Sequence, residues 1–122
     1  MARILIVEDN AANMTLGVVL LEHAGHTVLT ATDAETGLVL ARDAKPDLIL
    51  MDIQLPGMDG FKATVQLKHD VATSAIPVIA LTALAMKGDE ERIRAAGCDA
   101  YVVKPIRYKE LLTTIAAHLA RA

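Results

Sequence analysis

Short runs of aliphatic residues, each bounded by charged or turn-forming residues, recur five times along this chain. Most of them are continuous rather than alternating, which is typical of strands buried on both faces, as in a parallel sheet. Strands are predicted on this basis at residues 4–7, 27–31, 48–51, 78–81 and 101–103. Parallel neighbours need a long crossover connection, usually a helix. This feature therefore constrains the fold more than any other.

Helical patterns fill the intervals between these runs. Asn10 is placed to cap a first helix, and the stretch from Thr32 to Glu35 has the capping-box spacing for a second. Gly25 and Gly97 are the expected stop signals of the first and fourth helices. Three further helices are predicted over residues 59–68, 87–96 and 108–120. Apolar residues recur at helical spacing in four of the five predicted helices. From the first helix onward, these groups are Met14, Val18 and Leu21; Leu38 and Ala41; Phe61 and Val65; and Leu111, Leu112, Ile115 and Leu119.

The order strand–helix, repeated five times with short connections, predicts one α/β domain over residues 1–122. The expected architecture is a flavodoxin-like, doubly wound, parallel five-stranded sheet of order 2-1-3-4-5 in a three-layer sandwich. The length fits one domain, and the 53% of hydrophobic residues supplies a core without metal or disulfide. With a single domain that ends soon after the fifth helix, no output domain is expected.

Composition also excludes several classes of function. Aromatic residues make up only 2% and the net charge is −3 with scattered basic residues, so a nucleic-acid-binding groove is not expected. Cys98 is the only cysteine, which rules out a disulfide within the chain and suggests a buried structural thiol. The N-terminus is neither a signal peptide nor a membrane span. We expect a cytoplasmic protein that does not bind membranes.

Ionisable and hydroxyl side chains lie at the ends of four predicted strands. In an open parallel sheet, ligands bind beyond the carboxyl ends of the strands, at the point where the strand order reverses. Here that point lies between the first strand, which ends in Glu8 and Asp9, and the third, which ends in Asp52. The fourth strand ends in Thr82 and the fifth in Lys104. A hydroxyl and an ammonium group are therefore expected beside three carboxylates.

Converging carboxylates repel one another, and each resists ionisation unless a cation lies between them. All-oxygen ligands suit Mg²⁺, with Mn²⁺ as the alternative. A metal, a lysine and a hydroxyl around one carboxylate form a receptacle for a phosphoryl group. Asp52 is then expected to be the nucleophile and to be exposed to solvent at a strand end, where it could attack in line.

The strand-end motifs resemble the receiver domain of two-component response regulators. They are VEDN after the first strand, LILMDIQLPGMDG at the third, LTA at the fourth and KP at the fifth, and the resemblance runs from Arg3 to Leu119. The segments KPDLILMDIQLP and AMKGDEERIRAAGCDAY are similar to those of single-domain members that regulate cell division. Glu8 is a departure, because many members have Asp at this position.

The resemblance implies a role for each site residue. Asp52 would accept a phosphoryl group from a histidine of a sensor kinase or phosphotransfer protein. Asp9 would bind Mg²⁺ directly, Glu8 through water, and the backbone carbonyl of Gln54 would supply another ligand. Lys104 would contact the phosphoryl oxygens. Such a protein is a phosphoacceptor in signalling that catalyses only its own phosphorylation and dephosphorylation, rather than an enzyme acting on metabolites.

The resemblance also implies a switch. Thr82 would move toward the new phosphoryl group and Tyr101 would follow it inward, while Pro105 would follow a cis peptide bond. The face formed by the fourth helix, the fifth strand and the fifth helix would then present a changed surface to a downstream protein. A phosphoryl group supplies the charge and acceptor oxygens that such a change needs. A monomer or weak dimer is expected.

Other functions remain to be weighed against this one. An aspartate-nucleophile phosphatase of the haloacid dehalogenase type needs a second acid where this chain has Gln54, which cannot protonate a leaving group. A flavin carrier needs a phosphate-binding loop after the first strand, where the acids Glu8 and Asp9 would repel phosphate. A receiver fold used as a constitutive, phosphorylation-independent binding module stays open. So does a receiver domain cut from a larger hybrid kinase.

Overall fold

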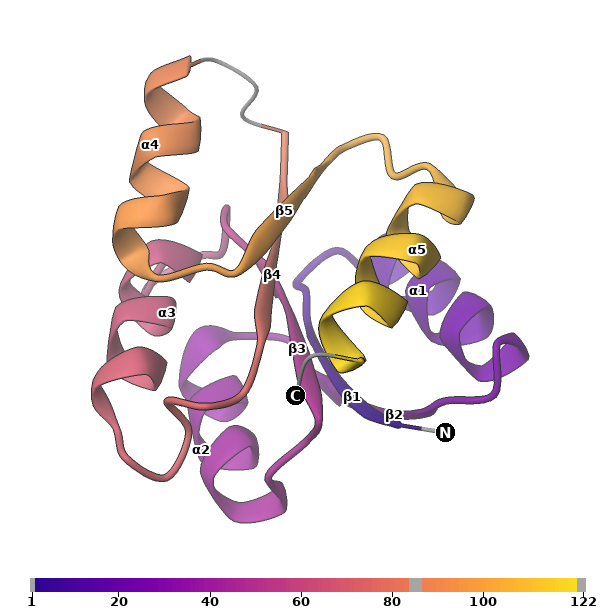
Figure 1. The fold of residues 1–122 in the computed structure, drawn as a ribbon, viewed down its shortest axis with the longest axis horizontal. Helices are drawn as coiled ribbons and strands as arrows, with labels where there is room; N and C mark the ends of the chain where they lie inside the picture. The colour runs from indigo at the N-terminus through magenta and orange to yellow at the C-terminus, as the bar shows by residue number, and fades with distance from the viewer. Residues whose placement is uncertain (1, 84–86, 121–122) are drawn as a thin grey trace.

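The computed structural model describes residues 2–83 and 87–120 of the chain, in which strands and helices alternate (Figure 1). The strands are β1 (Arg3–Val7), β2 (Thr27–Ala31), β3 (Leu48–Asp52), β4 (Val78–Thr82) and β5 (Ala100–Val103). The helices are α1 (Ala11–His23), α2 (Ala34–Ala44), α3 (Gly60–His69), α4 (Lys87–Ala96) and α5 (Tyr108–Leu119). No helix in the described part of the chain is both long and apolar enough to cross a membrane.

The five strands form one parallel sheet of order β2-β1-β3-β4-β5, which confirms the predicted topology. In the register, Val7 of β1 lies opposite Met51 of β3, and Asp52 lies opposite Leu81 of β4. Because the strands are parallel, their carboxyl ends meet at the same edge of the sheet. The residues that follow β1, β3, β4 and β5 are therefore brought together there.

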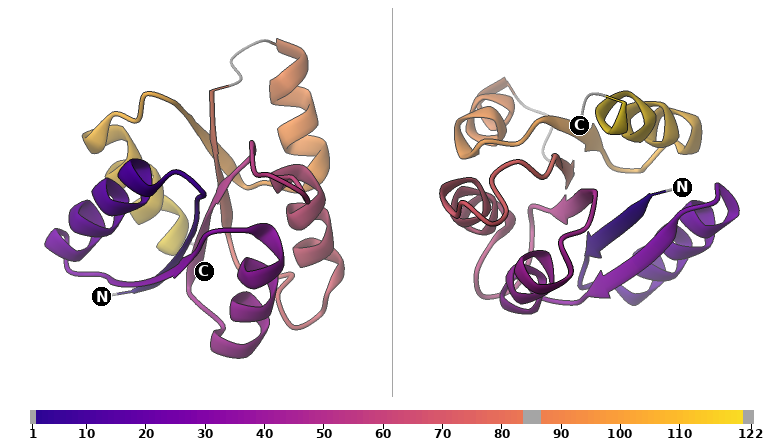
Figure 2. Two further views of the ribbon diagram at one scale, coloured as in Figure 1. Left: turned by 180° about the vertical axis from the view of Figure 1, so that it is seen from behind. Right: turned by 60° about the horizontal axis from the view of Figure 1, so that its bottom comes forward.

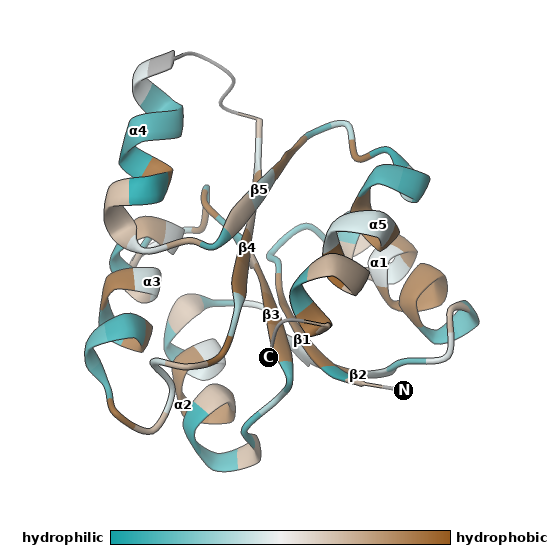
Figure 3. Ribbon diagram, in the orientation of Figure 1, coloured by the Kyte–Doolittle hydropathy of each residue, from teal (hydrophilic) through white to brown (hydrophobic). Residues whose placement is uncertain are grey.

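The sheet is covered by helices on both faces, as a three-layer sandwich requires (Figure 2). The α1/α5 face buries a cluster that includes Ile6, Leu50 and Ile115, and the opposite face buries a second cluster with Leu5 and Met51 against α2 and α3. Neighbouring residues of one strand thus face opposite layers. Figure 3 shows the hydrophobic residues concentrated on the strands. Burial on both faces is the reason that the apolar runs are continuous.

The N-terminal cap of α1 is the predicted residue, whereas the cap of α2 is not. Asn10 caps α1, where its side chain accepts a hydrogen bond from the N–H of Asn13 at 2.9 Å. The prediction that Thr32 caps the second helix is wrong. Asp33 has the extended backbone of a cap and accepts from the N–H of Thr36 at 2.7 Å, so α2 begins one residue later. A carboxylate in this position competes well with a hydroxyl for the free N–H groups.

The chain reverses after α1 and α4 at the two predicted glycines. Gly25 has φ 96° and Gly97 has φ 103°, conformations that glycine adopts without steric penalty. Both stop signals are confirmed.

The inner face of α3 is formed by three small residues and one leucine, and not by Phe61 and Val65, which lie one turn apart. Its buried residues are Gly60, Ala63, Thr64 and Leu67, whereas Val65 is 39% exposed and Phe61 is half-buried beneath the guanidinium of Arg92. The reason is a close approach at the start of the helix. A Cβ on Gly60 would lie 2.3 Å from the backbone oxygen of Asp52. Only glycine lets α3 begin this close to the end of β3.

The thiol of Cys98 is part of the packing between α3 and the β4–β5 edge. It is half-buried and donates a hydrogen bond to the hydroxyl oxygen of Thr64 at 3.8 Å. Burial raises the pKa of this thiol, which keeps it protonated. These features agree with the structural role expected from the sequence.

Candidate functional site

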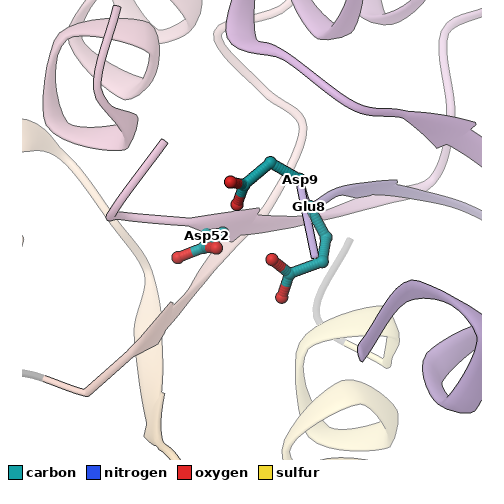
Figure 4. A group of neighbouring side chains, drawn as sticks. All are labelled: Glu8, Asp9 and Asp52. Carbon is teal, nitrogen blue, oxygen red and sulfur yellow. The ribbon is translucent and has the colours of Figure 1, made fainter. Parts of the chain in front are cut away.

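Three carboxylates meet where β1 and β3 end. Glu8 and Asp9 directly follow β1, and Asp52 is the last residue of the neighbouring strand β3. One ligand oxygen from each lies within 4.8 Å of the others, and Figure 4 shows the three side chains converging on a common space. Glu8 and Asp52 are buried, whereas Asp9 is exposed. The expectation that Asp52 is exposed is therefore wrong: the residue is 2% exposed, because it is the last residue of a central strand and lies beneath Glu8 and Lys104. The structure thus brings together the three acids that sequence analysis grouped.

Two backbone N–H groups position the buried carboxylates. The N–H of Gln54 donates to Oδ1 of Asp52 at 2.9 Å, and the N–H of Asn10 donates to Oε2 of Glu8 at 3.2 Å. In each case a side chain accepts from the residue two positions ahead, as in turns that begin with Asp or Asn. Sequence analysis missed these donors, because every residue except proline has an N–H. The only signal was that each acid lies at the start of a turn.

Lys104 directly follows the edge strand β5 and reaches the acids across the end of β4. Its Nζ lies 3.1 Å from Oε1 of Glu8 and 3.3 Å from Oδ2 of Asp52. The backbone supports this placement, since the N–H of Lys104 donates to the carbonyl of Thr82 at 2.7 Å. The peptide bond between Lys104 and Pro105 is cis, as the resemblance implied. Both ion pairs are largely shielded from water and are stronger than surface pairs.

Of the buried acids in the cluster, Asp52 is the one whose charged form is disfavoured. Burial, together with the neighbouring Glu8 carboxylate, raises the pKa of Asp52 to about 6. Burial also acts to raise the pKa of Glu8. The interactions of the Glu8 carboxylate with the Asp52 carboxyl, the Asn10 N–H and Lys104 outweigh the effect of burial, so the pKa of Glu8 is lowered. Burial opposes the charge of Lys104, but Asp52 and Glu8 raise the pKa of its ammonium group above the usual value.

The resistance to ionisation that we expected of each acid is therefore observed at Asp52 but not at Glu8. The Lys104 ammonium group and the Asn10 N–H stabilise Glu8 as an anion, whereas burial and the Glu8 carboxylate destabilise the ionised form of Asp52.

The expected switch residues lie at the end of β4, on β5 and directly after β5. Thr82 is fully buried at the end of β4, next to β3, which ends in Asp52. Tyr101 is half-buried on β5 and packs with Ile53 and its neighbours on the α3/α4 side of the sheet. Pro105 is exposed directly after Lys104. Thr82 is thus adjacent to the cluster, whereas Tyr101 belongs to a separate packing group.

The donor set of the cluster fits a hard divalent cation. All of the candidate ligands are oxygen atoms, which Mg²⁺ and Mn²⁺ prefer. One lysine against three carboxylates leaves an excess of negative charge that a divalent ion balances. Asp9 is exposed, so an ion can enter with part of its water shell. For Gln54 the described contact is through the N–H, and its carbonyl as a ligand stays a prediction.

Residues 4–116 match the sequence model of the response regulator receiver domain. The chain belongs to this family. The match begins at the second residue of β1 and covers every later element except the last turn of α5. The recognition made from the strand-end motifs is therefore confirmed.

A curated relative and two solved structures support this assignment over nearly the whole receiver domain. The polar-differentiation response regulator DivK of Brucella anthropi is 50% identical over 119 residues, which covers 98% of this chain and 97% of the relative. This agrees with the expected likeness to single-domain regulators of cell division.

Among solved structures, a putative response regulator from Chloroflexus aurantiacus has a TM-score of 0.93 at 28% identity, with 98% of both chains covered. The receiver domain of sensor histidine kinase PA1611 from Pseudomonas aeruginosa has a TM-score of 0.91 at 34% identity and the same coverage. That structure has a magnesium ion coordinated in its active-site cleft.

Proposed function

We propose that this receiver domain accepts a phosphoryl group on Asp52 from a phosphohistidine of a sensor kinase or phosphotransfer protein. The observation that carries the proposal is the arrangement around Asp52. Its buried carboxylate lies 3.3 Å from the ammonium group of Lys104. One of its oxygens lies within 4.8 Å of a carboxylate oxygen of each of two further acids. The family assignment supports the same reaction. A purely structural carboxylate would not need two further acids beside it.

In the transfer step, a carboxylate oxygen of Asp52 forms a bond to phosphorus. The bond between phosphorus and the donor's histidine nitrogen breaks, and its electron pair stays on that nitrogen. The N–H of Gln54 holds Oδ1 in place, so the attacking group is oriented before the donor arrives. Lys104 already contacts Oδ2 and is placed to pair with the new phosphoryl oxygens.

Glu8, Asp9, Asp52 and the carbonyl of Gln54 would hold Mg²⁺, or Mn²⁺ in its place. The bound ion would offset the negative charge on the phosphoryl oxygens. Asp9, exposed, is the accessible ligand, whereas Glu8 is buried and already paired with Lys104. This difference supports direct ligation by Asp9 and a more indirect role for Glu8.

Phosphorylation would then act on the α4-β5-α5 face. Thr82, buried next to Asp52, would form a hydrogen bond to a phosphoryl oxygen, and Tyr101 would repack against Ile53 and Ile93. A downstream protein would bind the altered face. The protein would work as a signalling phosphoacceptor and would catalyse only its own phosphorylation and dephosphorylation.

The likeness to DivK supports a role in cell-cycle signalling through protein contacts. We also propose that residues 1–122 act as one domain. The cytoplasmic location and the monomeric or weakly dimeric state stay predictions.

Intact-mass spectrometry after incubation with acetyl phosphate tests the proposal. We expect one phosphoryl adduct on the wild-type chain in the presence of Mg²⁺, with acetate as the leaving group. The adduct should be absent with a chelator and absent in Asp52→Asn. Asp59→Asn is a matched control, because this carboxylate caps α3 outside the cluster and its loss should leave the adduct unchanged.

An adduct that persists in Asp52→Asn would contradict the proposed acceptor. No adduct with acetyl phosphate or with a phosphorylated histidine kinase would instead favour the constitutive binding module, and capture of partners by the unmodified protein would follow. Turnover of a phosphorylated metabolite would favour a phosphatase.

A further inference from the structure

A cavity of about 380 Å³ lies between α1, α5 and the sheet, on the side of the molecule where those two helices pack. Ile6, Leu50 and Leu81 line it from three adjacent strands, and Leu20 and Leu111 line it from the two helices. The volume lies within the range of small-molecule sites, which are concave and mostly apolar. This cavity is distinct from the acidic cluster, although the two share a boundary.

Gly17 forms part of the cavity wall where α1 closely approaches Ile6. It lies in the middle of α1 and lines the cavity without a side chain. A Cβ at this position would lie 3.2 Å from Cδ1 of Ile6, so even alanine would narrow the cavity. Glycine inside a helix is unfavourable relative to alanine. The helix therefore contains a residue that weakens it at a point where it lines the cavity, and any larger side chain there would have to displace Ile6 or project into the cavity.

The polar boundary of the cavity is already charge-balanced. Glu8 and Lys104 line it, and they pair with each other at 3.1 Å. An anionic ligand would be repelled by Glu8, and a cationic ligand would have to displace Lys104 from Glu8. Asn13 also lines the cavity and can donate or accept a hydrogen bond. We propose that this cavity binds a small, uncharged, largely apolar molecule that carries one hydrogen-bonding group.

Such a ligand would influence the acidic cluster, because Glu8 and Lys104 belong to both sites. A ligand packed against Lys104 would restrict the positions that its ammonium group can adopt. Coupling of two sites through shared residues is reciprocal. Occupation of the cavity should therefore change the Mg²⁺ concentration needed for half-saturation, and Mg²⁺ should change the affinity for the ligand by the same factor.

Indole is a suitable probe, since it is uncharged, bicyclic and has one N–H donor. In a titration of the full, unmodified chain followed by ¹H–¹⁵N NMR, we expect saturable shifts of the Gly17, Leu20 and Leu111 amides, with millimolar or tighter affinity for so small a ligand. Tryptamine and indole-3-acetate, the charged analogues, should bind about tenfold or more weakly. Tighter binding of either analogue would overturn the proposed ligand class.

Variants of α1 show whether the shifts come from this cavity. Gly17→Leu should abolish the indole shifts and Gly17→Ala should weaken them, whereas Gly88→Ala, in a helix position with open space around it, should leave them unchanged. Should Gly17→Leu not fold, Leu16→Glu provides the second test. Leu16 lines the cavity and is 56% exposed, so a charge there is tolerated by the fold and should weaken indole binding.

Absence of saturable shifts, shifts centred elsewhere, or shifts that persist in the filled variants would overturn the proposal. Because the unmodified protein is used, this result is independent of whether Asp52 is phosphorylated.

Discussion

Asp52 is a buried carboxylate whose ionisation is disfavoured by the fold that surrounds it. Its side chain accepts one N–H bond and contacts one lysine, yet burial and the Glu8 carboxylate still raise its pKa to about 6. A nucleophile must be ionised and free to react, so it cannot be fully neutralised by permanent partners. At residue scale, the incomplete neutralisation of Asp52 therefore lowers the stability of the fold and is also what its proposed role as a nucleophile requires.

Replacement of Asp52 by Asn should stabilise the metal-free protein above pH 6. The folded-state pKa is about 6 against a usual value of 3.8, so between these two pH values the folded protein holds a proton that the unfolded chain has released, and above them its carboxylate is ionised at a cost in stability. Stability present below pH ~4 is therefore lost as pH rises to ~6. Urea unfolding in a chelating buffer should show the variant more stable by about 1–3 kcal/mol at pH 7.5, with no such gain at pH 4.

Asp43→Asn is the matched control for this experiment, since Asp43 is exposed on α2. It should show no comparable gain at either pH. An Asp52→Asn variant that is less stable than wild type at pH 7.5 would mean that the contact with Lys104 outweighs the burial of the carboxylate.

At the scale of single elements, capping decides where a helix begins. Sequence spacing favoured Thr32 as the cap of the second helix, but the chain turns into α2 one residue later. Both residues are chemically suitable caps, and the choice depends on the path of the backbone as it leaves β2. The Asp33 side chain takes the free N–H of Thr36, and this bond lowers the pKa of the carboxyl.

Replacement of the two candidates separately should show which residue is the cap. Asp33→Ala should lower the melting temperature, because the N–H of Thr36 loses its acceptor, whereas Thr32→Ala should leave it nearly unchanged. Calorimetry or circular dichroism at pH 7 measures both. The loss should also diminish at acidic pH, where the Asp33 carboxyl is protonated. Equal losses in both variants would contradict the Asp33 cap.

At the scale of the whole molecule, a cation that binds only the folded state should stabilise the entire domain. The three acids come from two strands and assemble only when β1 and β3 are paired. At a Mg²⁺ concentration about 100 times the dissociation constant, the gain is about 2.7 kcal/mol. Thermal melts with MgCl₂ should show a rise in melting temperature, and NaCl at equal ionic strength should not reproduce it.

Asp9→Asn and Asp52→Asn should each reduce the rise, while Asp43→Asn should preserve it. A wild-type melt that Mg²⁺ does not shift would contradict the proposed metal site.

Local pattern was sufficient to predict the strand order and the acidic edge. Continuous apolar runs mark strands buried on both faces, and the carboxyl ends of parallel strands must share one edge. Glu8, Asp9, Asp52 and Lys104 could therefore be grouped before any coordinates were known. The inner face of α3 could not be predicted, because the approach of Gly60 to the backbone of Asp52 depends on the distance between two elements.

The sequence by itself determined the sheet, its order and the residues at its acidic edge, because these depend on residue type and on periodicity along the chain. Only the tertiary structure decided how charge is distributed within the cluster and that a cavity lies beside it. Burial, the Asn10 and Gln54 N–H groups and the lysine distances set the pKa of each carboxyl. These quantities arise from residues far apart in the chain, and they exist only once the layers have packed.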